Sequence, residues 1–206
     1  MYALLFLALA SFLLSLLLTP LCRNLCRRWG LLDPPDSGRK LHKEALPRVG
    51  GVPIMCAYLG AVGLFLLSPL STQGNAEAGF QWAWKVLPAA VLVLVLGLVD
   101  DLRGLTPWQK LAGQFVAASA AFYAGVRITA IAGFSLDLWL SLPATIVWLV
   151  CCCNALNLID GVDGLATGAG WFATVTIALG ALLQDNLALA VATVPLAGAL
   201  LGFLRY

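Results

Sequence analysis

The sequence has few charged residues. Only 11% of its 206 residues are Asp, Glu, Lys or Arg, whereas 61% are hydrophobic; an average soluble domain has roughly 25% charged residues. This composition excludes an ordinary soluble domain, and so much apolar surface also excludes a disordered chain. Twelve Lys and Arg are balanced by ten Asp and Glu, so we expect no basic face and no nucleic-acid partner.

The cysteines lack the spacing of a disulfide framework or a zinc site. No Cys-x-x-Cys pair occurs, and all six lie at or within apolar segments, which favours small buried thiols. They are Cys22, Cys26, Cys56 and the run Cys151, Cys152 and Cys153.

Seven apolar segments indicate a polytopic membrane protein, because a spanning helix needs about 20 apolar residues. The first segment has no preceding basic stretch and no small-residue cleavage site. Arg23, Arg27 and Arg28 follow it instead, as they follow a stop-transfer anchor. The segments cover approximately 2–21, 52–68, 86–99, 111–125, 141–156, 169–184 and 187–204.

The basic residues predict the orientation of these spans. With the N-terminus outside, ten Lys and Arg fall in inner loops and only Lys85 and Arg127 in outer loops, which is a strong positive-inside bias. We therefore predict an all-α fold of about seven transmembrane helices, N-terminus out and C-terminus in. Residues 1–206 are expected to form one integral membrane domain, with a short extracytoplasmic hairpin or interfacial loop at 126–140.

An acidic pair follows the third apolar segment on the predicted inner side. Asp100 and Asp101 are adjacent at a helix end near the membrane surface, where like charges repel and desolvation is costly. A solvated helix terminus is the simpler interpretation. A cation site or an acid/base position is the functional one, because a divalent ion would relieve the repulsion.

Four polar side chains recur at every third position from the end of the fifth segment onward: Asn154, Asn157, Asp160 and Asp163. On a helix this spacing gathers oxygens on one face, and Gly161, Gly164 and Gly168 allow close approach of backbone amides to phosphate. Oxygen ligands favour Mg²⁺ or Mn²⁺. Helix capping would explain one or two of these residues but not four in register.

The inner loop after the first segment carries cations and the single histidine. Arg39, Lys40 and His42 lie among prolines and glycines, a pattern that also serves topology and anionic lipid binding. Lys110 lies at the start of the fourth segment, where its side chain can reach the headgroup level and meet a phosphate.

Together these motifs resemble the polyprenyl-phosphate N-acetylhexosamine-1-phosphate transferases, or glycosyltransferase family 4. The matching motifs are Arg39-Lys40-x-His42 leading to Pro47-x-x-Gly50-Gly51, then Leu98-Val99-Asp100-Asp101, and Asn154-x-x-Asn157-x-x-Asp160-Gly-x-Asp163-Gly-Leu-Ala. Leu46-Pro47-Arg48-Val49-Gly50-Gly51 looks like the undecaprenyl-phosphate N-acetylglucosaminyl group, although related UDP-N-acetylhexosamines stay open.

The resemblance implies a reaction at the cytoplasmic face of the bacterial inner membrane. UDP-N-acetylhexosamine and polyprenyl phosphate would give a polyprenyl-diphosphate sugar and UMP, with Mg²⁺ as cofactor and Mn²⁺ as the alternative. The product would initiate cell-wall or surface polysaccharide synthesis.

The family also implies roles for individual residues. Asp100 and Asp101 would be the essential acidic pair, Lys110 would hold the lipid phosphate, and Asp163 would meet the nucleotide sugar. Asn157 would be a metal ligand, with Asp160 at the metal and among the catalytic residues. We place Asn154, Arg39, Lys40 and His42 with the substrate-binding residues.

A base at Asp100 or Asp101 would contribute little. The second pKa of a phosphate monoester is about 6, so most of the lipid phosphate is already ionised at neutral pH. Positioning or metal binding is expected to matter more.

The sequence departs from the family at its end. The family usually continues with further spans, a Gly-Asp-x-Gly-Ser motif whose Asp binds metal, and a His-rich inner loop. Since neither motif is present before Tyr206, we expect a truncated chain with an incomplete metal site. An inactive fragment or assembly subunit of the family is the alternative, and a seven-helix transporter a remote one. Whether the chain forms a homodimer is open.

Overall fold

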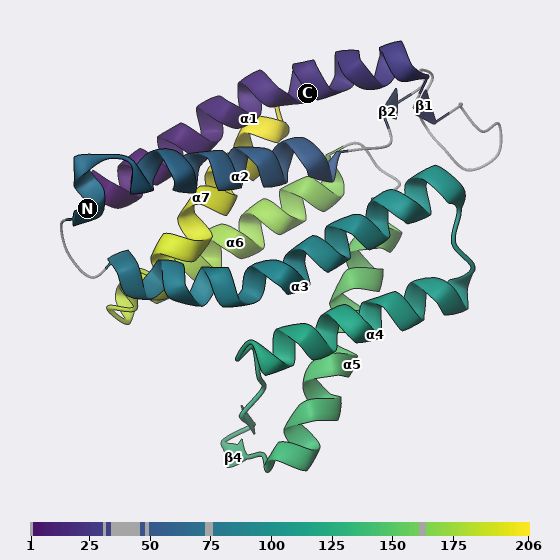
Figure 1. Ribbon diagram of the computed structural model, residues 1–206. Helices are drawn as coiled ribbons and strands as arrows, with labels where there is room; N and C mark the ends of the chain where they lie inside the picture. Colours follow the sequence, from purple (N-terminus) through teal and green to yellow (C-terminus); the bar gives the residue numbers. More distant parts are fainter. Residues whose placement is uncertain (1, 31, 34–45, 48–49, 73–75, 161–163) are drawn as a thin grey trace. The chain divides into compact units, whose positions relative to one another are not determined.

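The computed structural model describes residues 2–30, 32–33, 46–47, 50–72, 76–160 and 164–206. Seven α-helices account for most of this part of the chain, and each coincides with one of the seven predicted segments (Figure 1). Their bounds are α1 Tyr2–Trp29, α2 Gly51–Leu66, α3 Ala76–Arg103, α4 Pro107–Tyr123, α5 Leu138–Ile159, α6 Leu165–Leu183 and α7 Leu187–Phe203. A short 3₁₀ helix, η1, covers Pro69–Thr72.

The helices have the length and composition of membrane spans. Four are long and apolar enough to cross a bilayer: α1, residues 83–103 of α3, α5 and α6. Helices α2, α4 and α7 have 16, 17 and 17 residues, near the lower limit of about 17 residues for a spanning helix. The prediction of an all-α polytopic membrane protein is confirmed, whereas its orientation stays a prediction.

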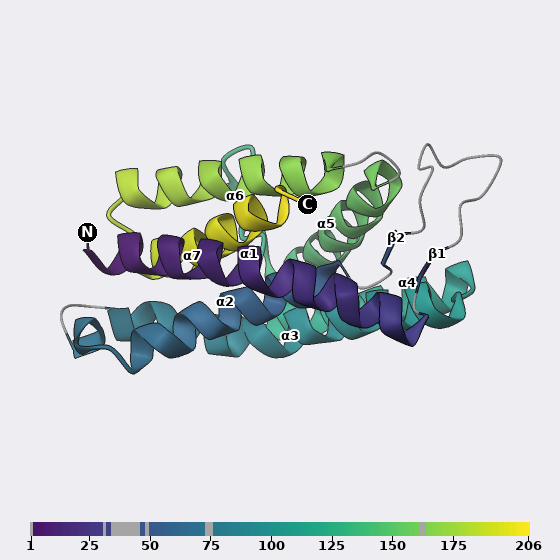
Figure 2. The same ribbon diagram turned by 90° about the horizontal axis from the view of Figure 1, so that it is seen from above.

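The chain divides into two compact units, residues 1–82 with 159–206, and residues 83–158. The first unit contains α1, α2, α6 and α7, which run alongside one another in both ribbon views (Figure 2). Its apolar core is formed by Leu7, Val62, Phe65, Phe80 and Val191. A two-residue antiparallel pairing, β1 (Leu32–Asp33) with β2 (Leu46–Pro47), follows α1.

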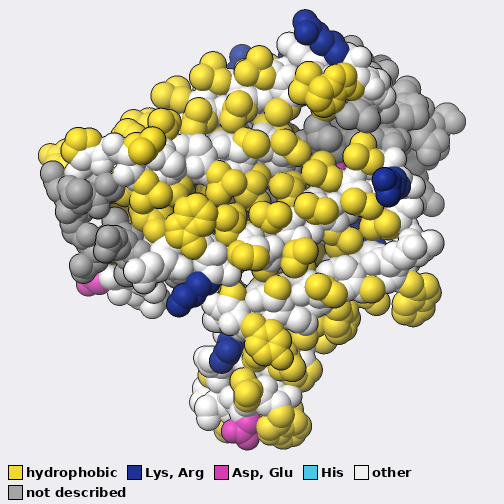
Figure 3. Space-filling model, viewed as in Figure 1, with side chains coloured by type: hydrophobic (Ala, Val, Ile, Leu, Met, Phe, Trp, Pro, Cys, Tyr) yellow, Lys and Arg dark blue, Asp and Glu magenta, His cyan; other side chains and the backbone are white. Residues whose placement is uncertain are grey.

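Helix α1 has polar residues inside and leucines outside. Ser11 and Ser15 are fully buried, while leucines at every fourth position, from Leu5 to Leu25, are exposed. Exposed leucines suit contact with lipid, and small residues at a helix interface let two backbones approach closely. On the face shown in Figure 3, hydrophobic side chains are widespread over the helices and charged side chains are few.

The second unit consists of residues 83–103 of α3 together with α4, a hairpin and α5. Helices α4 and α5 pack through Ala118, Ile146 and Val150. Helices α3 and α4 approach closely at Gly113, where an added Cβ would overlap the side chain of Leu96.

The hairpin predicted within 126–140 is present. Strand β3 (Ala130–Ile131) pairs antiparallel with β4 (Phe134–Ser135) through a two-residue turn. Both turn residues, Ala132 and Gly133, have positive φ (51° and 86°), as the commonest two-residue hairpin turn requires. Ser141 and Thr145 of α5 hydrogen-bond Ile128 O and N at 2.7 and 2.9 Å, which attaches the hairpin to the helix.

Candidate active site

A tight turn between α3 and α4 brings the end of one helix to the start of the next. Gly104 has φ +66°, and its N–H donates to Asp100 O at 2.8 Å, which closes the last turn of α3 with the left-handed residue common after helices. Thr106 then caps α4, since its hydroxyl accepts from Gln109 N while Gln109 Oε1 accepts from Thr106 N. This capping box fixes the first turn of α4.

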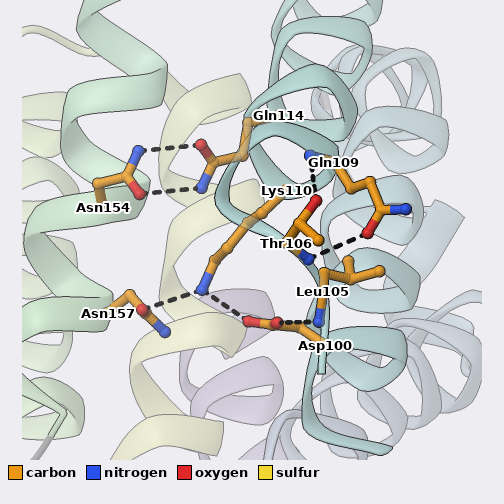
Figure 4. A network of polar contacts seen from close by, with 8 residues as sticks. All are labelled: Asp100, Leu105, Thr106, Gln109, Lys110, Gln114, Asn154 and Asn157. Atoms are coloured by element: carbon orange, nitrogen blue, oxygen red, sulfur yellow. Dashed lines mark hydrogen bonds and ion pairs between the residues drawn. The ribbon is translucent and has the colours of Figure 1, made fainter. Parts of the chain in front are cut away.

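The turn positions Lys110 directly against Asp100. Lys110 Nζ lies 2.7 Å from Asp100 Oδ2 and also donates to Asn157 Oδ1 at 3.0 Å (Figure 4). Asp100 Oδ1 accepts from Leu105 N at 3.0 Å. One ammonium therefore connects three helices: Asp100 belongs to α3, Lys110 to α4 and Asn157 to α5.

The environment of this cluster suits an exchangeable ion pair. The side chains of Lys110 and Asp100 are 21% and 23% exposed, so the pair is neither fully solvated nor sealed from water. An ammonium has three hydrogens, and the contacts with Asp100 and Asn157 use two of them. Among the described residues no other contact of Lys110 uses the third hydrogen, so it can bind an incoming acceptor such as a phosphate oxygen.

A second polar contact links α4 and α5 one helical turn from the first. Asn154 Nδ2 donates to Gln114 Oε1 at 2.9 Å, and Gln114 Nε2 donates to Asn154 Oδ1 at 3.4 Å (Figure 4). Asn154 Nδ2 also donates to Val150 O at 2.9 Å. Gln114 is buried, at 5% exposure, and sequence reasoning did not single it out. The available signal was its position four residues after Lys110, on the same face of an otherwise apolar helix.

The predicted site residues fall into three groups. Asp100, Lys110 and Asn157 form one contact cluster, with Asn154 a turn away. Two acidic residues lie at helix ends: Asp101 is exposed at the end of α3, and Asp160 directly follows α5. Asp163, Arg39, Lys40 and His42 lie outside the described residues.

Three of the four residues of the third motif are described, and the predicted helical spacing applies to two of these three. Helix α5 ends at Ile159, so Asn154 and Asn157 share a helix face whereas Asp160 belongs to the turn that follows. Asp160 is partly screened from water, which raises the pKa of its carboxyl above the ordinary value of an aspartate. A bound cation would oppose that shift.

The metal prediction rests on oxygen chemistry. Within the described residues, no cluster of three or more His, Cys, Asp and Glu side chains could hold a metal ion. Asp100 Oδ2 and Asn157 Oδ1 nevertheless converge on one cation, the Lys110 ammonium. Because Asp100 is paired with the ammonium, Asn157 Oδ1 is the oxygen of this cluster that suits Mg²⁺, which commonly takes only one or two protein ligands and completes its shell with water and substrate phosphate.

Comparison with known proteins identifies the lineage. The sequence profile of glycosyl transferase family 4 matches residues 83–206, which is more than half of the chain and includes the whole Asp100–Lys110–Asn157 cluster. The chain belongs to glycosyl transferase family 4.

Members of this family with assigned names are similar to nearly the whole chain. A probable undecaprenyl-phosphate N-acetylglucosaminyl 1-phosphate transferase of Bacillus subtilis (strain 168) is 31% identical over 202 residues, covering 95% of this chain and 53% of that protein. A decaprenyl-phosphate N-acetylglucosaminephosphotransferase of Mycobacterium tuberculosis (strain ATCC 25618 / H37Rv) is 34% identical over 199 residues, covering 89% and 48%.

A third relative is named for a different sugar substrate. The phospho-N-acetylmuramoyl-pentapeptide-transferase of Halalkalibacterium halodurans is 32% identical over 219 residues, covering 95% of this chain and 64% of that protein. The chain thus spans about half to two thirds of the length of these family 4 relatives.

Proposed function

We propose that this family 4 protein transfers N-acetylhexosamine 1-phosphate from a UDP-sugar to a polyprenyl phosphate, releasing UMP. The observation that carries the proposal is the three-helix contact of Lys110 with Asp100 and Asn157. It lies within the segment that matches the family. The names of the relatives supply the class of reaction.

Lys110 is the residue that we assign to the lipid phosphate. Its ammonium is half-buried near the end of an apolar helix pair, where a phosphate on a membrane-anchored chain can reach it. The bound phosphate would neutralise the ammonium directly. Charge-assisted hydrogen bonds to phosphate are about twice as strong as neutral ones. Asp100 keeps the ammonium in place between turnovers.

We assign Mg²⁺ to the soluble substrate. Asn157 would hold the ion together with the acidic residues of the motif, Asp160 foremost. When bound, Mg²⁺ neutralises the diphosphate of the UDP-sugar and makes UMP a better leaving group. Asn157 also accepts a hydrogen bond from Lys110, so one side chain connects the proposed metal region with the proposed lipid-phosphate region.

UDP-N-acetylglucosamine is the favoured donor. The run Leu46–Gly51 resembles the N-acetylglucosaminyl group, and two of the three relatives above are named for N-acetylglucosamine. The muramoyl-pentapeptide donor named for the third relative is the competing choice. We place the reaction at the cytoplasmic face of the bacterial inner membrane, where the positive-inside bias puts Asp100 and Lys110.

The test is UMP release by the purified protein in detergent, with UDP-N-acetylglucosamine, undecaprenyl phosphate and Mg²⁺. Lys110→Met should abolish turnover, whereas Lys85→Met, which removes an exposed lysine from α3, should leave it unchanged. UDP-N-acetylmuramoyl-pentapeptide is assayed in parallel. Turnover of neither donor by a folded parent protein would overturn the proposed function.

A further inference from the structure

The amide pair of Gln114 and Asn154 lies where it can control the geometry of the site. Gln114 is four residues after Lys110 on α4, and Asn154 is three residues before Asn157 on α5. The two helices are thus joined by two successive polar contacts, Lys110–Asn157 and, one turn further along, Gln114–Asn154. Beyond them the contact becomes apolar, at Ala118, Ile146 and Val150.

The orientation of this pair is determined by the backbone. Val150 O can only accept a hydrogen bond, so the side-chain group of Asn154 that faces it at 2.9 Å must be the NH₂ group. That leaves Asn154 Oδ1 as the acceptor for Gln114 Nε2, and Gln114 Oε1 as the acceptor for Asn154 Nδ2. The Val150 carbonyl therefore determines the orientation of both side-chain amides.

Gln114 is buried whereas Asn154 is exposed, so the cost of breaking the pair falls on Gln114 and favours one register of the two helices. Gln114 is 5% exposed, and an amide without a partner in such a place loses hydrogen bonds that it would have in water. Sliding α4 along α5, or rotating it, would break both bonds of the pair. The neighbouring apolar contacts involve a small residue, Ala118, and discriminate less sharply between registers.

We propose that Gln114, through its amide pair with Asn154, is a positioning residue that sets the register of α4 and α5 and so aims Lys110 at the lipid phosphate. This inference rests on the proposed function, in which Lys110 binds that phosphate. Gln114 does not touch substrate in this role. Its effect is exerted through the position of the Lys110 ammonium relative to Asn157 Oδ1.

The decisive experiment measures the KM for undecaprenyl phosphate and the KM for the UDP-sugar separately. Gln114→Leu keeps a similar volume but cannot pair with Asn154. It should raise the KM for undecaprenyl phosphate and lower kcat by about 10- to 100-fold together, because a displacement of ~1 Å can cost that much. The KM for the UDP-sugar should stay within about twofold of the parent value, since an unchanged contact leaves binding unchanged.

The matched control is Thr145→Val, also on α5. Thr145 is 1% exposed and hydrogen-bonds Ile128 N and Ser141 O at the hairpin end of the helix. Its loss should lower the melting temperature as much as Gln114→Leu does, while both KM values and kcat stay at the parent level. This comparison removes general destabilisation as an explanation.

Rescue by exchange of the partners completes the test. Gln114→Asn and Asn154→Gln should each impair turnover, and the double variant, which restores the combined length of the two amides, should recover it. Equal changes in both KM values, an unchanged kcat in Gln114→Leu, or no recovery in the double variant would overturn the inference while leaving the proposed function intact. A folded parent without turnover would instead remove the proposed function and the inference together.

Discussion

Lys110 is the residue on which most contacts of the candidate site converge. Its ammonium neutralises Asp100 and donates to Asn157, so its removal affects three helices at once. Loss of the cation leaves the Asp100 carboxylate partly buried with only the Leu105 N–H as a partner among these contacts. Removing one member of such a pair is costly because the other charge stays.

We predict that Lys110→Met, which abolishes turnover, also weakens the binding of polyprenyl phosphate. The expected loss of lipid affinity is about 10- to 100-fold, as for a charge-assisted hydrogen bond worth ~1.5–3 kcal/mol. Binding of the lipid phosphate to the purified protein, measured without UDP-sugar, checks this. Unchanged affinity would show that the phosphate is held elsewhere, and Lys85→Met is the control for removal of a positive charge.

We predict that activity requires a divalent metal ion and that Asn157 is one of its ligands. Chelation of divalent ions with EDTA should abolish turnover, and added Mg²⁺ should restore it, with Mn²⁺ as the second choice. Asn157→Ala should raise the Mg²⁺ concentration for half-maximal activity at least about tenfold, equivalent to ~1.4 kcal/mol of metal binding. Asn157→Asp keeps an oxygen ligand, so its Mg²⁺ concentration for half-maximal activity should lie between those of the parent protein and Asn157→Ala.

A capping asparagine controls for the loss of an amide. Asn186 accepts from Leu189 N at the start of α7, so Asn186→Ala should lower stability without changing the Mg²⁺ requirement. The metal assignment would fail if Asn157→Ala and the parent protein had the same Mg²⁺ dependence.

For single residues, the sequence predicted which ones belong to the site but not the contacts between them. Asp100, Lys110 and Asn157 could be assigned to one membrane side because topology and the family motifs agree. Their meeting at a single ammonium depends on how three helices cross, which no local spacing encodes. Gln114 escaped notice for the same reason, because an isolated glutamine in a helix has no function until its partner on α5 is known.

The packing of α1 against α7 illustrates how elements are held together in a protein surrounded by lipid. A Cβ added at Gly198 would overlap Ser11 Oγ and the backbone carbonyl of Ala8, and one added at Gly202 would lie 2.6 Å from Phe12 O. Without a hydrophobic driving force between helices, such backbone proximity is a main source of association. The two glycines are four residues apart, on one face of α7.

We therefore predict that Gly198→Ala destabilises the protein by about 1–3 kcal/mol, the usual cost of overpacking. Resistance to unfolding in detergent, followed by circular dichroism, measures the change. Gly180→Ala on α6 is the matched control, because a Cβ there would meet no atom within 4 Å. Equal stability of the two variants would mean that the interface between α1 and α7 accommodates the added methyl group without strain.

Helix positions were predictable because each apolar segment is bounded by charges, prolines or glycines. The ends of the helices were less predictable. Helix α1 continues through Trp29, well past the apolar stretch, and α3 begins at Ala76 rather than near residue 86. Helical hydrogen bonding does not stop at the membrane boundary, so hydropathy marks the part of the helix in lipid and misses the rest.

For the whole molecule the outstanding prediction is the orientation in the membrane. The positive-inside bias puts the β3–β4 hairpin outside and the start of α4 inside. In a variant without the six native cysteines, Ser135→Cys should react with a membrane-impermeant maleimide in intact cells. Trp108→Cys, at a position that is 80% exposed, should react only after permeabilisation. The reverse labelling pattern would show that the topology is inverted and that the candidate site faces the outside.

The second hydrogen bond of Asp100 has a consequence for the sequence of events at the site. Because Leu105 N holds Oδ1 independently of the contact between Lys110 and Oδ2, the ammonium can swing toward a substrate while the carboxylate stays where it is. In the proposed reaction Asp100 would stay in place while the Lys110 side chain leaves it and returns. Each turnover would then begin from the same arrangement, with the turn between α3 and α4 unchanged.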